Sequence, residues 1–229
     1  MIAPEILSLL PVALLGALLG LGVVSFPQAM ISRPIVAATL GGALAGDVTS
    51  GLVAGAVLEM IALEMLPVGA SRYPEWGTAS VVGGAMASAY YNLAGAAVVA
   101  VFASIVTAWA GSWSMYALRR LNGVWARREL ASLEAGRLGT AASLQLRGLT
   151  ADLARGFLLT FVALLVWIPL ASWLLSHWSL GRAPSHIVLA GVAAAVAGSA
   201  AWRLSQGVSM ARWCFLGGLV VGIVALVAR

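Results

Sequence analysis

Charged residues are scarce in this chain of 229 residues, at 9%, whereas hydrophobic residues make up 62% and the mean hydropathy is +1.00. A soluble domain carries roughly 25% charged residues, which cover its surface with groups that interact with water. The low charge therefore excludes an ordinary soluble domain. It predicts an all-α, polytopic integral membrane protein whose outer surface faces the lipid bilayer.

Lysine is absent, and cysteine occurs once, at Cys214. A single cysteine excludes an internal disulfide and a metal site built from several cysteines. The sequence has no histidine pair at metal-binding spacing and no phosphate-binding Gly-Lys-Ser/Thr loop, so we predict neither a cofactor nor use of ATP by this chain. The basic residues also lack interleaved aromatic residues, which argues against nucleic-acid binding.

Membrane spans are expected where apolar runs approach the roughly 20 residues that a helix needs to cross the bilayer core. The first run, 6–26, follows an N-terminus without the positive charges of a signal peptide, so we interpret it as a retained helix. Three more runs lie late in the chain, at 157–176, 187–202 and 213–228. With the shorter arms described below, we expect about six to eight membrane segments.

Seven of the thirteen arginines lie between residues 112 and 156, where only three acidic residues oppose them. This Arg-rich segment separates an N-terminal membrane region (1–111) from C-terminal membrane helices (157–229), and the positive-inside rule places it in the cytoplasm. Leucines and Trp125 at spacings of three and four predict an amphipathic helix along the membrane interface, broken near Gly136 and Gly139. The alternative is a solvated loop with helical pieces.

A pair of short apolar arms lies in the N-terminal region. Residues 35–46 and 52–63 flank the polar turn 46–51, and each arm would reach only about 18 Å as a helix. Because that is less than the bilayer core of about 30 Å, we expect a re-entrant helical hairpin around 35–63. Such interruptions mark the substrate site in transporters. The alternative is one Gly-kinked span followed by a surface loop.

Four acidic residues fall within or beside these apolar segments: Asp47, Glu59, Glu64 and Glu75. A charge at the bilayer centre costs at least roughly 2.5 kcal/mol, so it is kept only where it pairs, lines a cavity or functions. Asp47 is suited to cap the second arm of the hairpin. Glu59 is either a structural ion-pair partner of Arg33 or Arg72, or a functional carboxylate that lines a cavity.

Four motifs occur in order through the hairpin and beyond it. They are Ser32-Arg33-Pro34-Ile35-Val36-Ala37-Ala38-Thr39-Leu40, Gly46-Asp47-Val48-Thr49-Ser50-Gly51-Leu52, Leu58-Glu59-Met60-Ile61-Ala62-Leu63 and Val68-Gly69-Ala70. Together they resemble the enzyme IIC subunit of the mannose/fructose/sorbose phosphotransferase family. Three residues depart from the usual family pattern: Ser32 stands where His is frequent, Glu64 where a small residue is usual, and Glu75 where Asp follows Pro.

The resemblance implies a transport subunit that is not an enzyme on its own. It would bind a mannose-type hexose within the membrane and pass it to a separate cytoplasmic IIAB protein, which phosphorylates the sugar with phosphate from phosphoenolpyruvate. It also implies an enzyme IID membrane partner, a trimeric assembly and a location in the bacterial inner membrane. Carried over to this chain, the sugar-binding positions are Asp47, Thr49 and Glu59. We add Gln28, whose amide both donates and accepts hydrogen bonds.

Two other functions stay open at this point. One is a regulatory or assembly subunit without transport, since the departures at positions 32, 64 and 75 leave the sugar undefined. The other is an ion-coupled secondary carrier, because intramembrane carboxylates suit a cation or a proton as well as a sugar.

Overall fold

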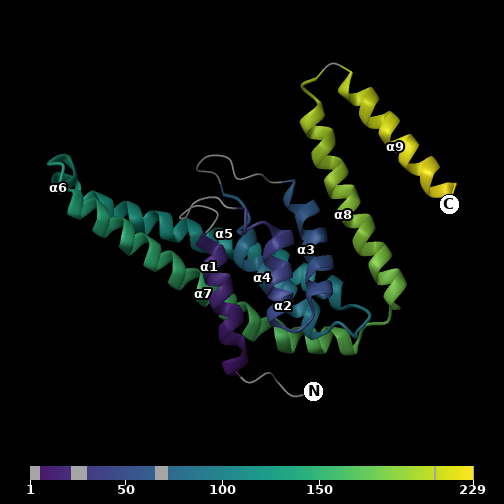
Figure 1. Ribbon diagram of the computed structural model, residues 1–229, viewed down its shortest axis with the longest axis horizontal. Helices are drawn as coiled ribbons and strands as arrows, with labels where there is room; N and C mark the ends of the chain where they lie inside the picture. Colours follow the sequence, from purple (N-terminus) through teal and green to yellow (C-terminus); the bar gives the residue numbers. More distant parts are fainter. Residues whose placement is uncertain (1–5, 22–29, 65–71, 209, 229) are drawn as a thin grey trace.

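The computed structural model describes residues 6–21, 30–64, 72–208 and 210–228, and its regular elements are all helical in these residues. In chain order they are a short 3-10 helix η1 (Ile6–Leu9) and the α-helices α1 (Leu10–Leu21), α2 (Pro34–Leu44), α3 (Val48–Ala62), α4 (Trp76–Ala89), α5 (Ala96–Arg128), α6 (Leu130–Glu134), α7 (Leu138–Ser176), α8 (Arg182–Ser205) and α9 (Ala211–Val227). Figure 1 shows α1 to α4 grouped against α5 and α7, with α8 and α9 to one side.

Three of these helices, α5, α7 and α8, are long and apolar enough to cross a membrane by length and composition. The runs expected at 157–176 and 187–202 lie within α7 and α8, and the run at 213–228 corresponds to α9, which is a shorter apolar helix. The expected first span begins as η1 and continues as α1 to Leu21, and its last residues lie outside the described part of the chain. The all-α membrane fold is confirmed, whereas the number of spans stays a prediction.

The expected hairpin is formed by α2 and α3, which pack antiparallel to each other. The turn is tighter than predicted, because α3 begins at Val48 rather than near Leu52. Gly46 has φ +103°, a left-handed conformation that residues with a side chain rarely adopt, and it lets the chain reverse directly after α2. Asp47 then starts α3 by accepting a hydrogen bond from the Thr49 amide at 3.0 Å.

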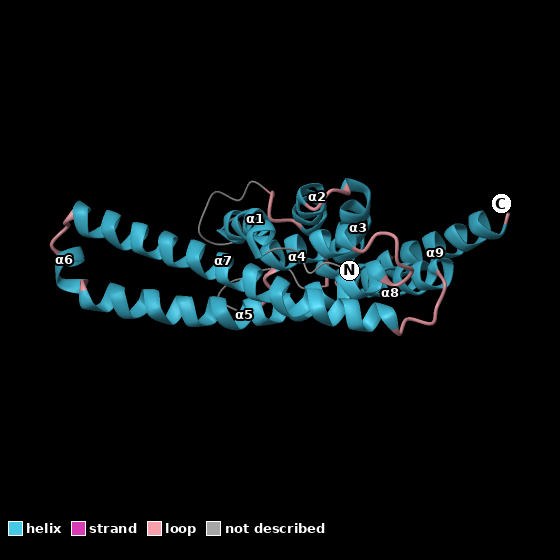
Figure 2. Ribbon diagram, turned by 90° about the horizontal axis from the view of Figure 1, so that it is seen from below, coloured by secondary structure: helices cyan, strands magenta, loops and turns pink. Residues whose placement is uncertain are grey.

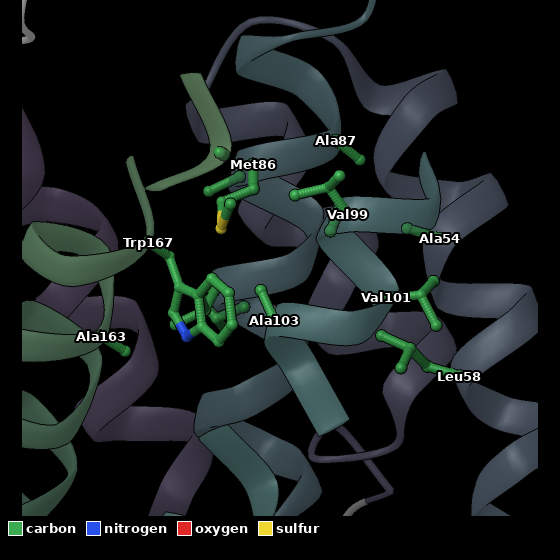
Figure 3. Packing of buried hydrophobic residues seen from close by; sticks show 14 of the residues in the cluster. Ala54, Leu58, Met86, Ala87, Val99, Val101, Ala103, Ala163 and Trp167 are labelled. Atoms are coloured by element: carbon green, nitrogen blue, oxygen red, sulfur yellow. The ribbon is translucent and has the colours of Figure 1, made fainter. Parts of the chain in front are cut away.

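Glycines allow the backbones of α2, α3 and α4 to touch. A Cβ atom on Gly51 would lie 2.6 Å from the Ala38 carbonyl oxygen, and one on Gly84 would lie 2.6 Å from the Ala38 carbonyl carbon. Residues 77–88 of α4 are all buried, so this helix forms the centre of the bundle. Figure 3 shows the surrounding apolar core, in which Leu58, Met86 and Trp167 bring α3, α4 and α7 together.

The contact between α2 and α4 gives a stability prediction. Gly84→Ala places a methyl group where it overlaps the Ala38 backbone. The backbone cannot rotate away as a side chain would, so α2 and α4 must separate. We expect a loss of about 1–3 kcal/mol, measured as a melting temperature several degrees lower in detergent.

Gly191→Ala in α8 is the matched control, because nothing lies within 4 Å of a Cβ atom at this position. Alanine favours a helix interior by up to about 1 kcal/mol over glycine, so the control should melt at the same temperature or higher. An equal loss of stability in both variants would contradict the close-packing argument.

Helices α5 and α7 run without a break through the boundaries expected for the Arg-rich segment at 111/112 and 156/157. The two helices form an antiparallel arm that ends in α6, far from the other helices (Figures 1 and 2). The chain reverses after α6 at Gly136, which has φ +70°, whereas Gly139 lies inside α7. The composition changes within each helix, because the apolar part is uncharged and the arginines lie mostly in the part that forms the arm.

The last turn of α1 identifies one end of the bundle, here called the α1 end. The Ser32 hydroxyl, just before α2, donates to the Leu19 carbonyl oxygen at 2.8 Å, and a Cβ atom on Gly77 in α4 would lie 2.6 Å from the same oxygen. The Arg155 side chain of α7 lies beside Gly20. The starts of α2 and α4 and the base of the arm therefore lie together.

Candidate functional site

The carboxylate of Glu59 lies at the α1 end, against the start of α2. It forms an ion pair with Arg33, the N-cap residue of that helix, and its second oxygen accepts a hydrogen bond from the Ile35 amide at 3.3 Å. Negative charge is favourable at a helix N-terminus, where backbone N–H groups lack partners within the helix. Of the two roles expected for Glu59, the structure contains the ion pair with Arg33.

The ion pair still has capacity for a ligand. The side chain of Glu59 is 19% exposed and that of Arg33 is 35% exposed, so solvent or a ligand reaches both groups. A carboxylate offers about four lone-pair positions and a guanidinium five N–H donors, and only part of this capacity is used by the contacts described. The pair therefore presents acceptors and donors side by side, which suits the neighbouring hydroxyl groups of a sugar.

Asp47 and Thr49 lie at the tip of the hairpin. The two carboxylate oxygens of Asp47 accept hydrogen bonds within the turn, from the Thr49 amide at 3.0 Å and the Ser50 hydroxyl at 2.5 Å. The Asp47 amide donates to the Ser88 hydroxyl at 2.7 Å, which fixes the tip to the last turn of α4. The expected capping role of Asp47 is present, and the side chain of Thr49 is exposed beside it.

The structure brings Asp47 and Thr49 together but separates them from Glu59. Glu59 follows Asp47 by twelve positions along α3, and at a rise of about 1.5 Å per residue this places them about 18 Å apart. A single hexose ring is too short to contact both. Gln28, the fourth expected sugar-binding residue, lies outside the described residues.

A buried polar network lies where α4, α5 and α7 meet. Glu75 is 1% exposed and caps α4 by accepting hydrogen bonds from the Thr78 amide and hydroxyl. Asp152, also 1% exposed, pairs with Arg155 at 2.8 Å, and Arg155 donates to the Ser114 hydroxyl and stabilises the nearby Glu75 carboxylate electrostatically. The sequence placed Asp152 and Arg155 in the interfacial segment, and their spacing of three residues was the missed sign of a pair on one helix face.

Glu64, at the end of the hairpin, forms an ion pair with Arg203 near the end of α8. This contact joins α8 to the α1 end of the bundle. Within the described ranges, no group of three His, Cys, Asp or Glu side chains is close enough to hold a metal ion. The polar groups of the site are thus suited to hydrogen bonding and charge pairing.

An all-α bundle with long apolar helices, a short helical hairpin and an ion pair at the base of that hairpin defines a polytopic membrane protein with a partly exposed polar site at one end of the bundle. Residues 6–179 match the model of the family described as the sorbose-specific IIC component of the phosphotransferase system (PTS). The chain belongs to this family.

Curated relatives match over shorter segments. The mannose-specific EIIC component of Escherichia coli strain K12 is 36% identical over 66 residues, which cover 29% of this chain and 25% of that protein. The sorbose-specific EIIC component of Klebsiella pneumoniae is 32% identical over 76 residues, covering 33% of this chain and 28% of that protein. The matched segments thus span only about a quarter of the relatives' length.

Solved structures share the fold over the whole chain. A chain described as a membrane protein superposes with a TM-score of 0.76 at 19% identity, covering 100% of this chain and 92% of the other. A chain from the cryo-EM structure of the mannose transporter ManYZ in complex with microcin E492 superposes with a TM-score of 0.62 at 18% identity, covering 99% and 94%. At these identities the likeness concerns the fold alone.

Proposed function

We propose that the chain is the membrane permease subunit, enzyme IIC, of a phosphoenolpyruvate-dependent sugar phosphotransferase system. The observation that carries the proposal is the partly exposed Glu59–Arg33 ion pair at the base of the hairpin, in a chain of the sorbose-specific IIC family. A mannose-type hexose contacts this pair through neighbouring hydroxyl groups. The relatives named for mannose and sorbose transport support a sugar as the ligand.

The arrangement of arginines supports an orientation. Arg33, Arg155 and Arg203 lie at the α1 end, from which the Arg-rich arm also projects. Arg182 lies at the opposite end, where it donates to the carbonyl oxygens of Tyr91 and Asn92. By the positive-inside rule, the α1 end faces the cytoplasm of a bacterial inner membrane. Glu59 then lies on the side where a IIAB protein phosphorylates the sugar.

Asp47 and Thr49 form a second polar position at the other end of the hairpin, which a sugar contacts at a different stage of its passage. Gln28, which precedes α2 in the chain, stays among the proposed sugar-binding residues. The permease acts with an enzyme IID subunit in a trimeric assembly. The ManYZ transporter, whose fold the chain shares, supports a membrane partner of this kind.

The test is phosphorylation of labelled hexoses by membranes that contain the chain, an enzyme IID partner and a IIAB protein, with phosphoenolpyruvate as the phosphate source. Omitting the chain or the partner in turn provides the controls. Activity that requires the chain supports the permease. A stable complex with the partner but no activity on any hexose would instead indicate a regulatory subunit, and sugar flux that follows a pH gradient without phosphoenolpyruvate would indicate an ion-coupled carrier.

A further inference from the structure

Two arginines stack on the same tyrosine at the base of the arm. The guanidinium carbon of Arg72 lies 3.8 Å from the ring centre of Trp113 and 4.7 Å from that of Tyr116. The guanidinium carbon of Arg120 lies 5.9 Å from the Tyr116 ring centre. These cation–π contacts hold two positive charges close to one aromatic residue. The cluster is called here the Arg72–Arg120 cluster.

The described residues provide no carboxylate partner for these two arginines. The ion pairs within the described residues join other arginines to carboxylates: Arg33 to Glu59, Arg155 to Asp152 and Arg203 to Glu64. Glu75, which follows Arg72 closely in the chain, is buried and accepts its hydrogen bonds from Thr78. Arg72 and Arg120 are both exposed, so their N–H groups are available to donate to a ligand of opposite charge outside the chain.

The cluster lies where a lipid headgroup would be found. Helix α5 has no charged residue from Ala96 to Leu118, which is enough to cross a bilayer core of about 30 Å, and its first charges follow directly. Trp113 is 60% exposed and Tyr116 is 42% exposed on the outside of this helix. Tryptophan and tyrosine in such positions anchor a helix at the membrane–water interface.

The space beneath the cluster is too small to enclose a larger soluble ligand. The cavity that Arg72, Tyr116 and Ser112 line has a volume of about 10 Å³, enough for roughly one water molecule. A hexose phosphate does not fit into it. A phosphate group that binds here has to approach from the surface of the helix, as the headgroup of a lipid does.

We propose that the Arg72–Arg120 cluster binds the phosphate groups of anionic phospholipids in the cytoplasmic leaflet. Each guanidinium donates to one phosphate, while the exposed Trp113 and Tyr116 rings contact the glycerol and the first acyl carbons. Two charges at a fixed spacing favour either a lipid with two phosphates or two neighbouring lipids with one phosphate each. The site is independent of the sugar position at Glu59.

Native mass spectrometry tests the proposal on the full chain, purified with any partner subunit that remains bound. The protein is mixed with phosphatidylglycerol, cardiolipin or phosphatidylcholine, and the retained lipids are counted. We expect the wild type to retain the anionic lipids, and Arg72→Gln/Arg120→Gln to bind them roughly thirtyfold more weakly. Arg147→Gln is the matched control, because this exposed arginine of the arm takes no part in the cluster.

Three outcomes would overturn the proposal. The first is equal retention of anionic lipids by the wild type and the double variant when both melt at the same temperature. The second is an equal loss in the Arg147→Gln control, which would indicate diffuse attraction to the whole arm. The third is displacement of lipid by millimolar hexose phosphate or inorganic phosphate, which would assign the cluster to a soluble phosphate. Single substitutions, Arg72→Gln or Arg120→Gln, replace the double variant if it does not fold.

Discussion

Hexose phosphorylation by membranes carrying Glu59→Gln is expected to fall by at least about tenfold, while the variant still inserts and assembles. Glutamine keeps the size of the side chain, but its single oxygen can accept from only one of the two donors, Arg33 or the Ile35 amide. It also loses the charge that strengthens hydrogen bonds to sugar hydroxyls. Hydrogen bonds to charged groups contribute about 1.5–3 kcal/mol each, which corresponds to roughly tenfold to hundredfold in affinity. Equilibrium binding of labelled hexose measures the loss directly.

Glu64→Gln is the matched control, since Glu64 lies five residues further on and also forms an ion pair, with Arg203. It should leave sugar binding unchanged. The double variant Arg33→Gln/Glu59→Gln separates the two roles of Glu59, because it removes both charges of the ion pair together. If the double variant recovers normal sugar binding, Glu59 serves only to neutralise Arg33, and its assignment to the sugar site is wrong.

Arg155→Met is expected to destabilise the fold by about 3–5 kcal/mol, because it leaves the buried Asp152 carboxylate without its ion-pair partner and removes the positive charge near the buried Glu75 carboxylate. The side chain of Arg155 is 9% exposed and that of Asp152 is 0% exposed, so water cannot replace the lost charge. Melting in detergent, followed by tryptophan fluorescence, should show a large shift or a failure to accumulate folded protein.

Two further variants make this prediction specific. Arg147→Met removes an exposed arginine from the same helix and should leave the melting temperature unchanged. The triple variant Glu75→Gln/Asp152→Asn/Arg155→Met removes the buried charges of both signs and should recover part of the stability lost in Arg155→Met. Normal stability of Arg155→Met itself would show that the network contributes little to folding.

The helical hairpin could be predicted from the sequence because its ends are marked chemically. Pro34 suits the first position of a helix, Gly46 allows the turn, and the arms between these marks are too short to span a bilayer. The position at which α3 begins could not be placed as well. The start of α3 at Val48 depends on the hydrogen bond from the Thr49 amide to Asp47. The same polar residues could also form a longer turn, with the helix starting later.

The candidate site was predicted less completely than the fold. The motif with Asp47 and Thr49 and the motif with Glu59 follow each other closely in the sequence, but a helix of this length carries its two ends to different places. Contacts between distant segments, such as Arg33 with Glu59 or Arg155 with Ser114, depend on how the helices pack. Composition therefore assigned Asp152 and Arg155 to a polar surface, although packing of α4 against α7 buries them.

The glycine contacts between α2, α3 and α4 have a mechanical consequence. Where backbones touch without side chains between them, there are no rotamers that can rearrange to absorb a sliding motion. The tip of the hairpin is also held by the Ser88 hydroxyl at the last turn of α4. These three helices therefore behave as one stiff body. A rigid-body displacement of these helices would have to take place along their contacts with α1, α5, α7 and α8, and it would leave the geometry around the Glu59 carboxylate unchanged.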